Sequence, residues 1–262
     1  MLVLNLEGKT ALIGGSTQGI GLAIAQELAT QNANCILISR SEEKLKHAVS
    51  TLNTDFNQKH SYLIADYSNP LQVQEVVQEY LKNNTIDILV NNTGGPAGGQ
   101  IINAKFDDFI NAFQQHLICN HLLMQLVAEG MKQKGFGRII NIISTSVKIP
   151  LKELGVSNTI RGAVASWAKT MANELAKYGI TVNNVLPGAT TTERLEVILK
   201  NKTSKSGKTR EEVESDMLAE IPAGRFGKPE EIASLVSYLA SPAAAYINGT
   251  SIPVDGGRTG SI

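Results

Sequence analysis

The chain has 262 residues, and its 24 Lys and Arg balance 24 Asp and Glu, so the formal net charge is zero. A neutral chain carries no long-range field that attracts nucleic acid or an anionic membrane surface. No apolar run approaches the roughly 20 residues of a membrane span, and the N-terminus enters a predicted strand without a basic segment or cleavage site. We therefore expect a cytoplasmic protein that acts on a small molecule or a protein partner, with no nucleic-acid and no membrane partner.

Short apolar runs alternate along the chain with segments of helical periodicity, a pattern typical of parallel strands joined by crossover helices. The strands are apolar almost throughout, which indicates that helices cover both faces of the sheet. The sequence thus predicts one α/β domain over residues 1–262, a Rossmann-like, doubly wound, three-layer α/β/α fold with a seven-stranded parallel sheet. Strands are predicted at 10–15, 35–39, 61–65, 86–90, 138–143, 180–186 and 250–254, and helices at 19–32, 41–53, 70–83, 107–133, 155–178 and 229–240.

The cysteines and the basic run point to structural roles. Cys35 falls in a predicted strand and Cys119 in a predicted helix, so we expect two buried thiols in a reducing compartment. The histidines show no metal-ligand spacing, and no metal site is predicted. The run KNKTSKSGKTR, residues 200–210, is predicted to be a solvated loop, with a phosphate-binding lid as the alternative.

The segment GGSTQGIG, residues 14–21, joins the first predicted strand to the first helix. Its glycines at 15, 19 and 21 permit a tight turn, let backbone amides approach an anion and let the helix pack closely on the sheet. In the first βαβ unit, such a turn predicts that a dinucleotide pyrophosphate binds at the start of the helix. The second strand ends in Arg40, where an acidic residue would bind the ribose of NAD. Because a guanidinium binds phosphate in a bidentate manner, Arg40 favours NADP, with NAD as the alternative.

Nearly the whole chain resembles the short-chain dehydrogenase/reductase family, especially its 3-oxoacyl-(acyl-carrier-protein) reductase-like members. The resemblance rests on the glycine turn, IADYSNP (64–70), NNTG (91–94) where the family has NNAG, GRIINIIS (137–144), GITVNNVLPG (179–188) and INGTSIPVDGG (247–257). It implies an oxidoreductase acting on a carbonyl or alcohol substrate. The cofactor-binding residues expected from the motifs and the resemblance are Gly15, Ser16, Gly19, Ile20, Gly21, Arg40, Asp66, Asn91, Gly94, Pro187, Gly188 and Thr192.

The chain departs from the family at its catalytic residues. In the family, a Ser after the fifth strand is followed thirteen residues later by Tyr and four after that by Lys, and an Asn lies on the preceding helix. Ser144 is retained, whereas Ser157 stands at the Tyr position, Arg161 at the Lys position and His116 at the Asn position. No tyrosine occurs between residues 81 and 177, so a small shift in register cannot restore the phenol. The Thr that usually begins the glycine motif is replaced as well, by Gly14.

The missing phenol raises the question of the proton donor. Hydride reduction of a carbonyl leaves an alkoxide, which the family's Tyr protonates because the adjacent Lys lowers a phenol pKa of about 10. Ser157 is a far weaker acid and Arg161 keeps its proton, so these residues, one helical turn apart and directed toward Ser144, can only orient the substrate or stabilise charge. The candidate acid is His116, with an ordinary pKa of about 6.5; the alternative is a hydrogen-bonded residue beside Asn120 in a packed helix.

Three functions stay open on these residues. The first is an NADP(H)-dependent oxidoreductase with a modified catalytic tetrad, which acts on a small-molecule or acyl-thioester substrate. The others are a catalytically degenerate dinucleotide-binding or regulatory protein, and a structural subunit without nucleotide affinity. Residues 189–220 resemble the family's substrate lid, and their alternative role is packing against the domain. By the same resemblance, the small side chains of helix 155–178 predict a homotetramer.

Overall fold

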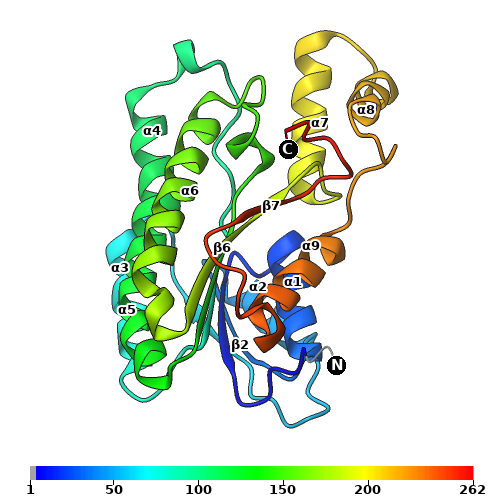
Figure 1. The fold of residues 1–262 in the computed structure, drawn as a ribbon. Helices are drawn as coiled ribbons and strands as arrows, with labels where there is room; N and C mark the ends of the chain where they lie inside the picture. The colour runs from blue at the N-terminus through cyan, green and yellow to red at the C-terminus, as the bar shows by residue number, and fades with distance from the viewer. Residues whose placement is uncertain (1–3, 262) are drawn as a thin grey trace.

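A computed structural model describes residues 4–261 and contains one sheet of seven parallel strands, in the order β3-β2-β1-β4-β5-β6-β7. The sheet lies between two layers of helices (Figure 1), so the predicted Rossmann-like α/β/α fold is confirmed. Each predicted strand is present, with bounds that differ by at most two residues at an end. The strands are β1 (Thr10–Gly14), β2 (Asn34–Ser39), β3 (Ser61–Ile64), β4 (Ile88–Asn91), β5 (Gly137–Ile142), β6 (Ile180–Pro187) and β7 (Ser251–Val254).

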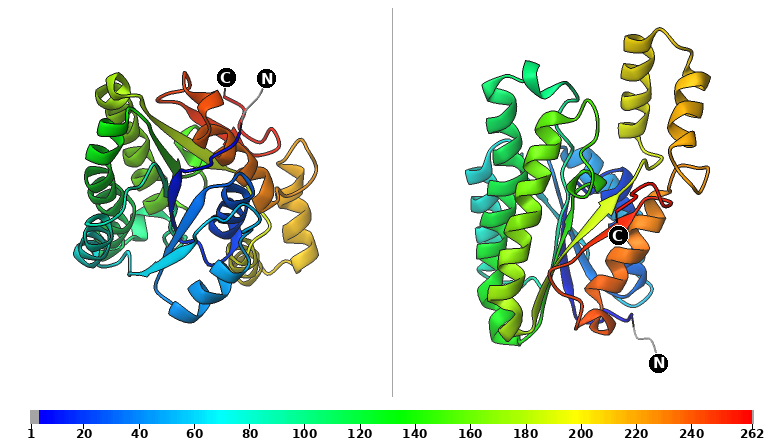
Figure 2. Two further views of the ribbon diagram at one scale, coloured as in Figure 1. Left: turned by 90° about the horizontal axis from the view of Figure 1, so that it is seen from below. Right: turned by 45° about the horizontal axis from the view of Figure 1, so that its top comes forward.

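The two helical layers follow from the alternation of side chains along each buried strand. On β1, Ile13 packs into the core on one face and Leu12 into the core on the other, because successive side chains of a strand point to opposite faces. The layer over Ile13 contains α1 (Gly19–Thr30), α2 (Glu42–Ser50) and α9 (Pro229–Ala240). The layer over Leu12 contains α3 (Pro70–Leu81), α5 (Cys119–Lys134) and α6 (Gly155–Leu175), as Figure 2 shows. The free thiols of Cys35 and Cys119 are buried, one in each core.

The helix predicted over residues 107–133 is in fact interrupted. It consists of α4 (Phe106–Phe113), one π-helical turn (Gln114–Ile118) and α5. A π turn adds a residue to the helix and rotates the residues that follow, and such turns are frequent at functional sites. Here the turn contains His116, whose side chain is buried. Short 3₁₀ helices occupy Ile101–Asn103, Thr145–Val147, Ala176–Tyr178 and Pro242–Ala244.

The basic segment 200–210 is largely helical, so its prediction as a loop was wrong. Its first residues belong to α7 (Glu193–Ser206), and its last residue, Arg210, begins α8 (Arg210–Ala219). The apolar residues Leu195 and Leu199 of α7 pack against Val213 of α8, and lysine is a good helix former, so burial and propensity outweigh the charge of the segment.

The two helices α7 and α8 form a hairpin that leaves the sheet and returns to it at one point. Thr190 and Gly227 form an isolated parallel bridge, and the amide of Thr191 donates to the carbonyl oxygen of Gly227 at 2.8 Å. Figures 1 and 2 show the pair, in yellow and orange, standing at one end of the molecule.

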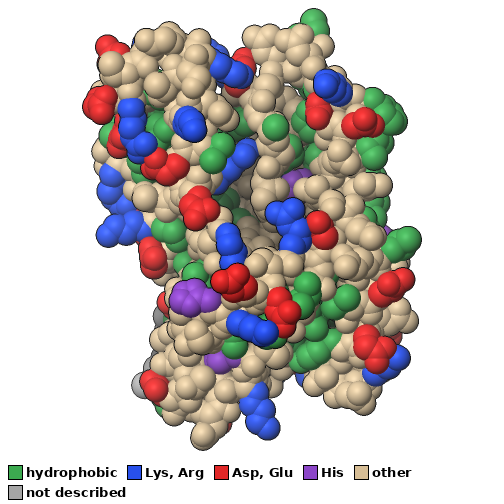
Figure 3. All heavy atoms as spheres, turned by 180° about the vertical axis from the view of Figure 1, so that it is seen from behind, with side chains coloured by type: hydrophobic (Ala, Val, Ile, Leu, Met, Phe, Trp, Pro, Cys, Tyr) green, Lys and Arg blue, Asp and Glu red, His purple; other side chains and the backbone are tan. Residues whose placement is uncertain are grey.

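Within residues 4–261, no helix is both long and apolar enough to span a bilayer. Charged side chains of both signs are scattered over the face shown in Figure 3.

A row of buried amide side chains crosses three neighbouring strands. Asn91 donates to Asn141 at 2.8 Å, Asn141 to Asn184 at 2.9 Å and Asn184 to Ser251 at 3.0 Å. These residues are directly paired in the strand register, so the side chains repeat the ladder of the backbone. The row therefore ties β4, β5, β6 and β7 together through their side chains.

We predict that Asn141→Leu lowers the free energy of unfolding by about 2–5 kcal/mol, because it leaves a buried donor on Asn91 and a buried acceptor on Asn184 without partners. Urea unfolding of wild type and variant measures the difference. Asn201→Leu, at an exposed position of α7, is the control and should change stability by less than about 0.5 kcal/mol. Equal stability of Asn141→Leu and wild type would show that the amide row is not stabilising.

Candidate functional site

A cavity of about 790 Å³ runs along the edge where the parallel strands end. It lies at the point where the chain order reverses between β1 and β4, which is where doubly wound sheets bind their ligands. Most residues expected from the sequence line it: Gly15, Gly19, Ile20, Gly21, Arg40, Asp66, Gly94, Ser144, Ser157, Arg161, Pro187, Gly188 and Thr192.

The glycine turn has the backbone that an anion cradle needs. Gly15 and Gly19 have φ of +53° and +54°, a region that residues with a Cβ rarely adopt. A Cβ on Gly21 would lie 2.2 Å from the carbonyl oxygen of Gly15, so only glycine lets α1 approach the turn. The first turn of α1 has no side-chain cap and no acidic residue, which leaves its backbone amides free to bind an anion. These features fit a dinucleotide pyrophosphate.

The space that a threonine would fill at Gly14 is taken by a tyrosine. A Cβ on Gly14 would lie 2.7 Å from the hydroxyl oxygen of Tyr67 and 2.6 Å from the carbonyl oxygen of Asn92. The turn is braced instead by Asn92, whose side-chain amide donates to the carbonyl oxygens of Gly14 and Gly15 at 3.1 and 3.3 Å. Tyr67 thus fills the space beside Gly14 and Asn92 braces the turn, so the turn keeps its shape.

One end of the cavity carries the residues expected to distinguish NADP from NAD. Arg40 lines it with an exposed side chain, and its Nη1 lies 3.9 Å from Oδ2 of Asp66. Lys44, which the sequence reasoning did not single out, lines the same end from α2. Two cations at the end of β2 would attract a 2′-phosphate.

Two residues expected to bind the cofactor do not line the cavity. Asn91 is 2% exposed because its amide is engaged in the row across the sheet, and the next residue, Asn92, reaches the cavity in its place. Ser16 is completely buried beneath the turn. The structure thus places both residues outside the cavity lining, where the motifs had led us to expect them in it.

At the other end of the cavity, Ser144, Ser157 and Arg161 lie on neighbouring segments. Ser144 follows β5, and its hydroxyl oxygen accepts from the amide of Ser146 at 3.1 Å, which leaves its hydrogen free to donate. Arg161 of α6 is 7% exposed, and its Nη1 donates to the carbonyl oxygen of Ile142 at 3.2 Å. Burial, and then the charge of Arg194, lower the pKa of Arg161 to about 10, so it stays a cation at neutral pH.

His116 lies behind the cavity wall and not on its surface. It is 1% exposed, and its Nδ1 is 2.6 Å from the hydroxyl oxygen of Thr93, a residue that lines the cavity. Burial, and then the charge of Arg161, lower the pKa of His116 to about 2. The imidazole is therefore neutral, and the protonated acid considered from the sequence is not present at neutral pH. The histidine and the Thr of NNTG, both departures from the family pattern, contact each other.

A second arginine, which the sequence reasoning missed, reaches the same region from α7. Arg194 lines the cavity, and its Nη2 donates to the carbonyl oxygen of Pro96 at 2.6 Å. Its position immediately after Thr192 and Glu193, in the first turn of α7, was the available signal. The arginine therefore connects α7 to the loop that follows β4.

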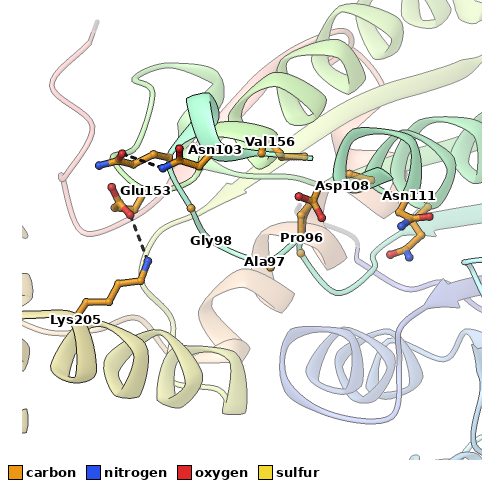
Figure 4. A pocket seen from close by; sticks show the side chains of 15 residues that line it. Pro96, Ala97, Gly98, Asn103, Asp108, Asn111, Glu153, Val156 and Lys205 are labelled. Carbon is orange, nitrogen blue, oxygen red and sulfur yellow. Dashed lines mark hydrogen bonds and ion pairs between the residues drawn. The ribbon is translucent and has the colours of Figure 1, made fainter. Parts of the chain in front are cut away.

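A second cavity of about 670 Å³ adjoins the first and shares Gly95 and Gln115 with it. Figure 4 shows amide and carboxylate side chains around it, and the ion pair between Lys205 and Glu153, 3.4 Å apart, on one side. Polar residues make up much of its lining: Gln100, Asn103, Asp108, Asn111, Gln115, Glu153 and Lys205. The two cavities together provide space for a dinucleotide and for a polar small molecule beside it.

Comparisons with known proteins agree with this geometry. A family profile described as Enoyl-(Acyl carrier protein) reductase matches residues 15–259. The chain is 36% identical over 257 residues to 3-oxoacyl-(acyl-carrier-protein) reductase FabG of Vibrio cholerae serotype O1, covering 97% of this chain and 98% of the relative.

Two solved structures share the fold over nearly their whole length. L-sorbose reductase from Gluconobacter frateurii, complexed with NADPH and L-sorbose, has a TM-score of 0.92 at 30% identity and 100% coverage of both chains. A gluconate 5-dehydrogenase from Burkholderia cenocepacia J2315, in complex with NADP and tartrate, has a TM-score of 0.87 at 31% identity. The match covers 99% of this chain and 98% of the dehydrogenase chain. With these matches, the glycine cradle and the parallel sheet place the chain in the short-chain dehydrogenase/reductase family of NAD(P)-dependent oxidoreductases.

Proposed function

We propose that the chain is an NADP(H)-dependent reductase of a small carbonyl compound. The observation that supports this most strongly is that the cavity keeps its glycine cradle while a buried cation, Arg161, replaces the missing Tyr and Lys pair. Each unusual residue also has a partner that suits it, Tyr67 beside Gly14 and Thr93 beside His116. A site that had lost its function would not need such matched replacements.

The cofactor would lie along the edge of the sheet. The amides at the start of α1 would hold the pyrophosphate, and Arg40 with Lys44 would hold the 2′-phosphate. Pro187, Gly188 and Thr192 line the far part of the same cavity. When bound, NADPH supplies the hydride that converts the carbonyl to an alcohol.

The residues of this chain would orient the carbonyl and stabilise the charge that develops on its oxygen. Ser144 has a free hydroxyl hydrogen to donate, and the buried Arg161 guanidinium provides a fixed positive charge. In this proposal Arg161 remains the fixed positive charge, and water delivers the proton to the alkoxide. General acid catalysis typically contributes about 10²–10⁴ in rate, so turnover should be slower than in relatives with the phenol.

His116 would act as a positioning residue. Its Nδ1 contacts Thr93 on the loop after β4, and its buried Nε2 has no partner within residues 4–261. A neutral imidazole in this place holds the cavity wall beside Arg161 without adding a second charge.

Several further assignments belong to the same proposal. We infer that α7 and α8 form the substrate lid, since their base at Thr190 and Gly227 is narrow and Arg194 reaches the cavity. A homotetramer in the cytoplasm is inferred from the resemblance, from the buried free thiols and from the exposed apolar side chains of Phe106 and Ile110 on α4. The relatives are named for 3-oxoacyl-(acyl-carrier-protein), L-sorbose and gluconate, so the fold alone does not choose the substrate.

The cofactor assignment predicts that Arg40→Ala weakens NADPH binding about tenfold and leaves NADH binding within about twofold, because only NADPH carries the phosphate that the arginine would contact. Calorimetric titration of each reduced cofactor into wild type and variant measures this. Lys46→Ala, which removes a solvent-exposed charge from the same α2 outside the cavity, is the matched control.

Wild type is expected to bind NADPH and to oxidise it when a suitable ketone is supplied. If neither cofactor binds, the proposed function is wrong and the chain is a structural subunit. If NADPH binds but no carbonyl compound in a broad panel is reduced, the chain is a dinucleotide-binding protein without turnover.

The burial of His116 predicts a specific dependence of stability on pH. The unfolded chain takes up a proton on this histidine below pH of about 6.5, whereas the folded chain, with its pKa lowered to about 2, does not. Its contribution is thus complete above about pH 6.5 and is lost as pH falls. At about 1.4 kcal/mol per pH unit, the free energy of unfolding of wild type should fall by about 2 kcal/mol between pH 6.5 and pH 5. The His116→Gln variant should not show this decrease. Urea unfolding at both pH values tests this, and parallel losses in the two proteins would contradict it.

A further inference from the structure

Among the described residues 4–261, the buried cation Arg161 has no counter-charge. It is 7% exposed, and its one hydrogen bond within that range runs to the carbonyl oxygen of Ile142. Buried charges are normally paired, because removing an ion from water costs several kcal/mol that only a strong partner offsets. A guanidinium has five N–H donors, so most of those on Arg161 are available to a ligand.

Arg194 brings a second positive charge to the same space. A Cβ on Gly95 would lie 3.7 Å from Nη2 of Arg194 and 3.9 Å from Nη2 of Arg161, so the two groups flank one point beside the loop after β4. Within residues 4–261, neither arginine has a carboxylate oxygen within 4.0 Å. Two like charges that flank one point repel each other, and the charge of Arg194 adds to burial in lowering the pKa of Arg161. An anion between them would relieve this repulsion.

The acidic residues of the cavity lie elsewhere. Asp66 is near Arg40 at the opposite end, and Glu193 accepts from the side-chain amide of Gln18 at 2.7 Å. In the proposed function, the start of α1 binds the pyrophosphate of the dinucleotide and Arg40 binds its 2′-phosphate. The anion that fits between Arg161 and Arg194 is therefore expected to come from the second reactant.

The adjoining cavity indicates what the rest of that reactant is like. It begins at Gly95, and its amide and carboxylate side chains offer hydrogen bonds to hydroxyl groups. We propose that Arg161 and Arg194 bind the carboxylate of a short, hydroxylated keto acid, whose polar remainder occupies the second cavity. This inference rests on the proposed reductase function and defines its substrate class.

The reaction on such a substrate balances without a further reactant. Bound NADPH would supply one hydride to the ketone carbon, which would turn the C=O double bond into a C–O single bond and leave NADP⁺. One proton from water would convert the alkoxide to a hydroxyl group and leave hydroxide. The carboxylate takes no part in the chemistry and serves to hold the ketone beside Ser144.

The test uses two pairs of probes that differ in charge: 5-keto-D-gluconate with L-sorbose, in which a hydroxymethyl group replaces the carboxylate, and pyruvate with methyl pyruvate. Binding of each probe to the full-length protein saturated with NADP⁺ is measured by calorimetry, and reduction by oxidation of NADPH. We expect at least one anion to bind about tenfold or more tightly than its neutral partner, as for charge-assisted hydrogen bonds from arginine.

Three variants locate the effect. Arg194→Gln should remove the preference for the anion, and Gly95→Ala should reduce it, because the added methyl group would occupy the space between the guanidinium groups at ordinary contact distances. Lys200→Gln, which removes an exposed charge from the same α7 outside both cavities, should leave the preference unchanged.

The outcomes separate this inference from the function on which it rests. If NADPH binds and neutral ketones bind or react as well as the anions in both pairs, the carboxylate assignment is wrong and the reductase stands. If the anions are preferred but Arg194→Gln keeps the preference, the arginine pair is not the site. If NADPH itself does not bind, both proposals fail together.

Discussion

The buried positive charge of Arg161 is the constraint on which the rest of this site depends. It lies where β5 ends and is held by a hydrogen bond to the backbone, and it lines the cavity with no ion-pair partner among residues 4–261. Burial, and then the charge of Arg161, keep the neighbouring His116 neutral, and its Nδ1 contacts the hydroxyl group of Thr93. In the proposed reaction, the same charge would attract an anionic substrate and would stabilise the developing alkoxide.

The unusual residues of this protein are best understood as contacting sets. Gly14 leaves room for the hydroxyl of Tyr67, His116 meets Thr93, and Arg161 shares its space with Arg194. These contacts support the proposal that electrostatic positioning takes the place of a phenolic acid at this site. Such a site can still transfer hydride, because the cradle for the dinucleotide does not depend on the proton donor.

Much of the fold was predictable because its signals are local. The seven strands are continuous apolar runs, and the glycine turn must be glycine for reasons of backbone geometry alone. What could not be predicted depends on contacts between distant residues. The row of amides beginning at Asn91 becomes visible only when the register of β4, β5 and β6 is known, and the π turn at His116 depends on how the helix packs. The basic run from residue 200 was predicted to be a solvated loop because of its charge. The apolar contact between α7 and α8 that makes it helical is not evident from that charge.

The most direct test of the electrostatic account is a crystal structure of the protein with NADP⁺ and 5-keto-D-gluconate. The account predicts the dinucleotide along the carboxyl edge of the sheet, with its pyrophosphate at the start of α1, and the carboxylate of the keto acid within hydrogen-bond distance of both Arg161 and Arg194. A structure in which a cofactor phosphate lies between the two arginines, or in which the keto acid is bound with its carboxylate away from them, would contradict it.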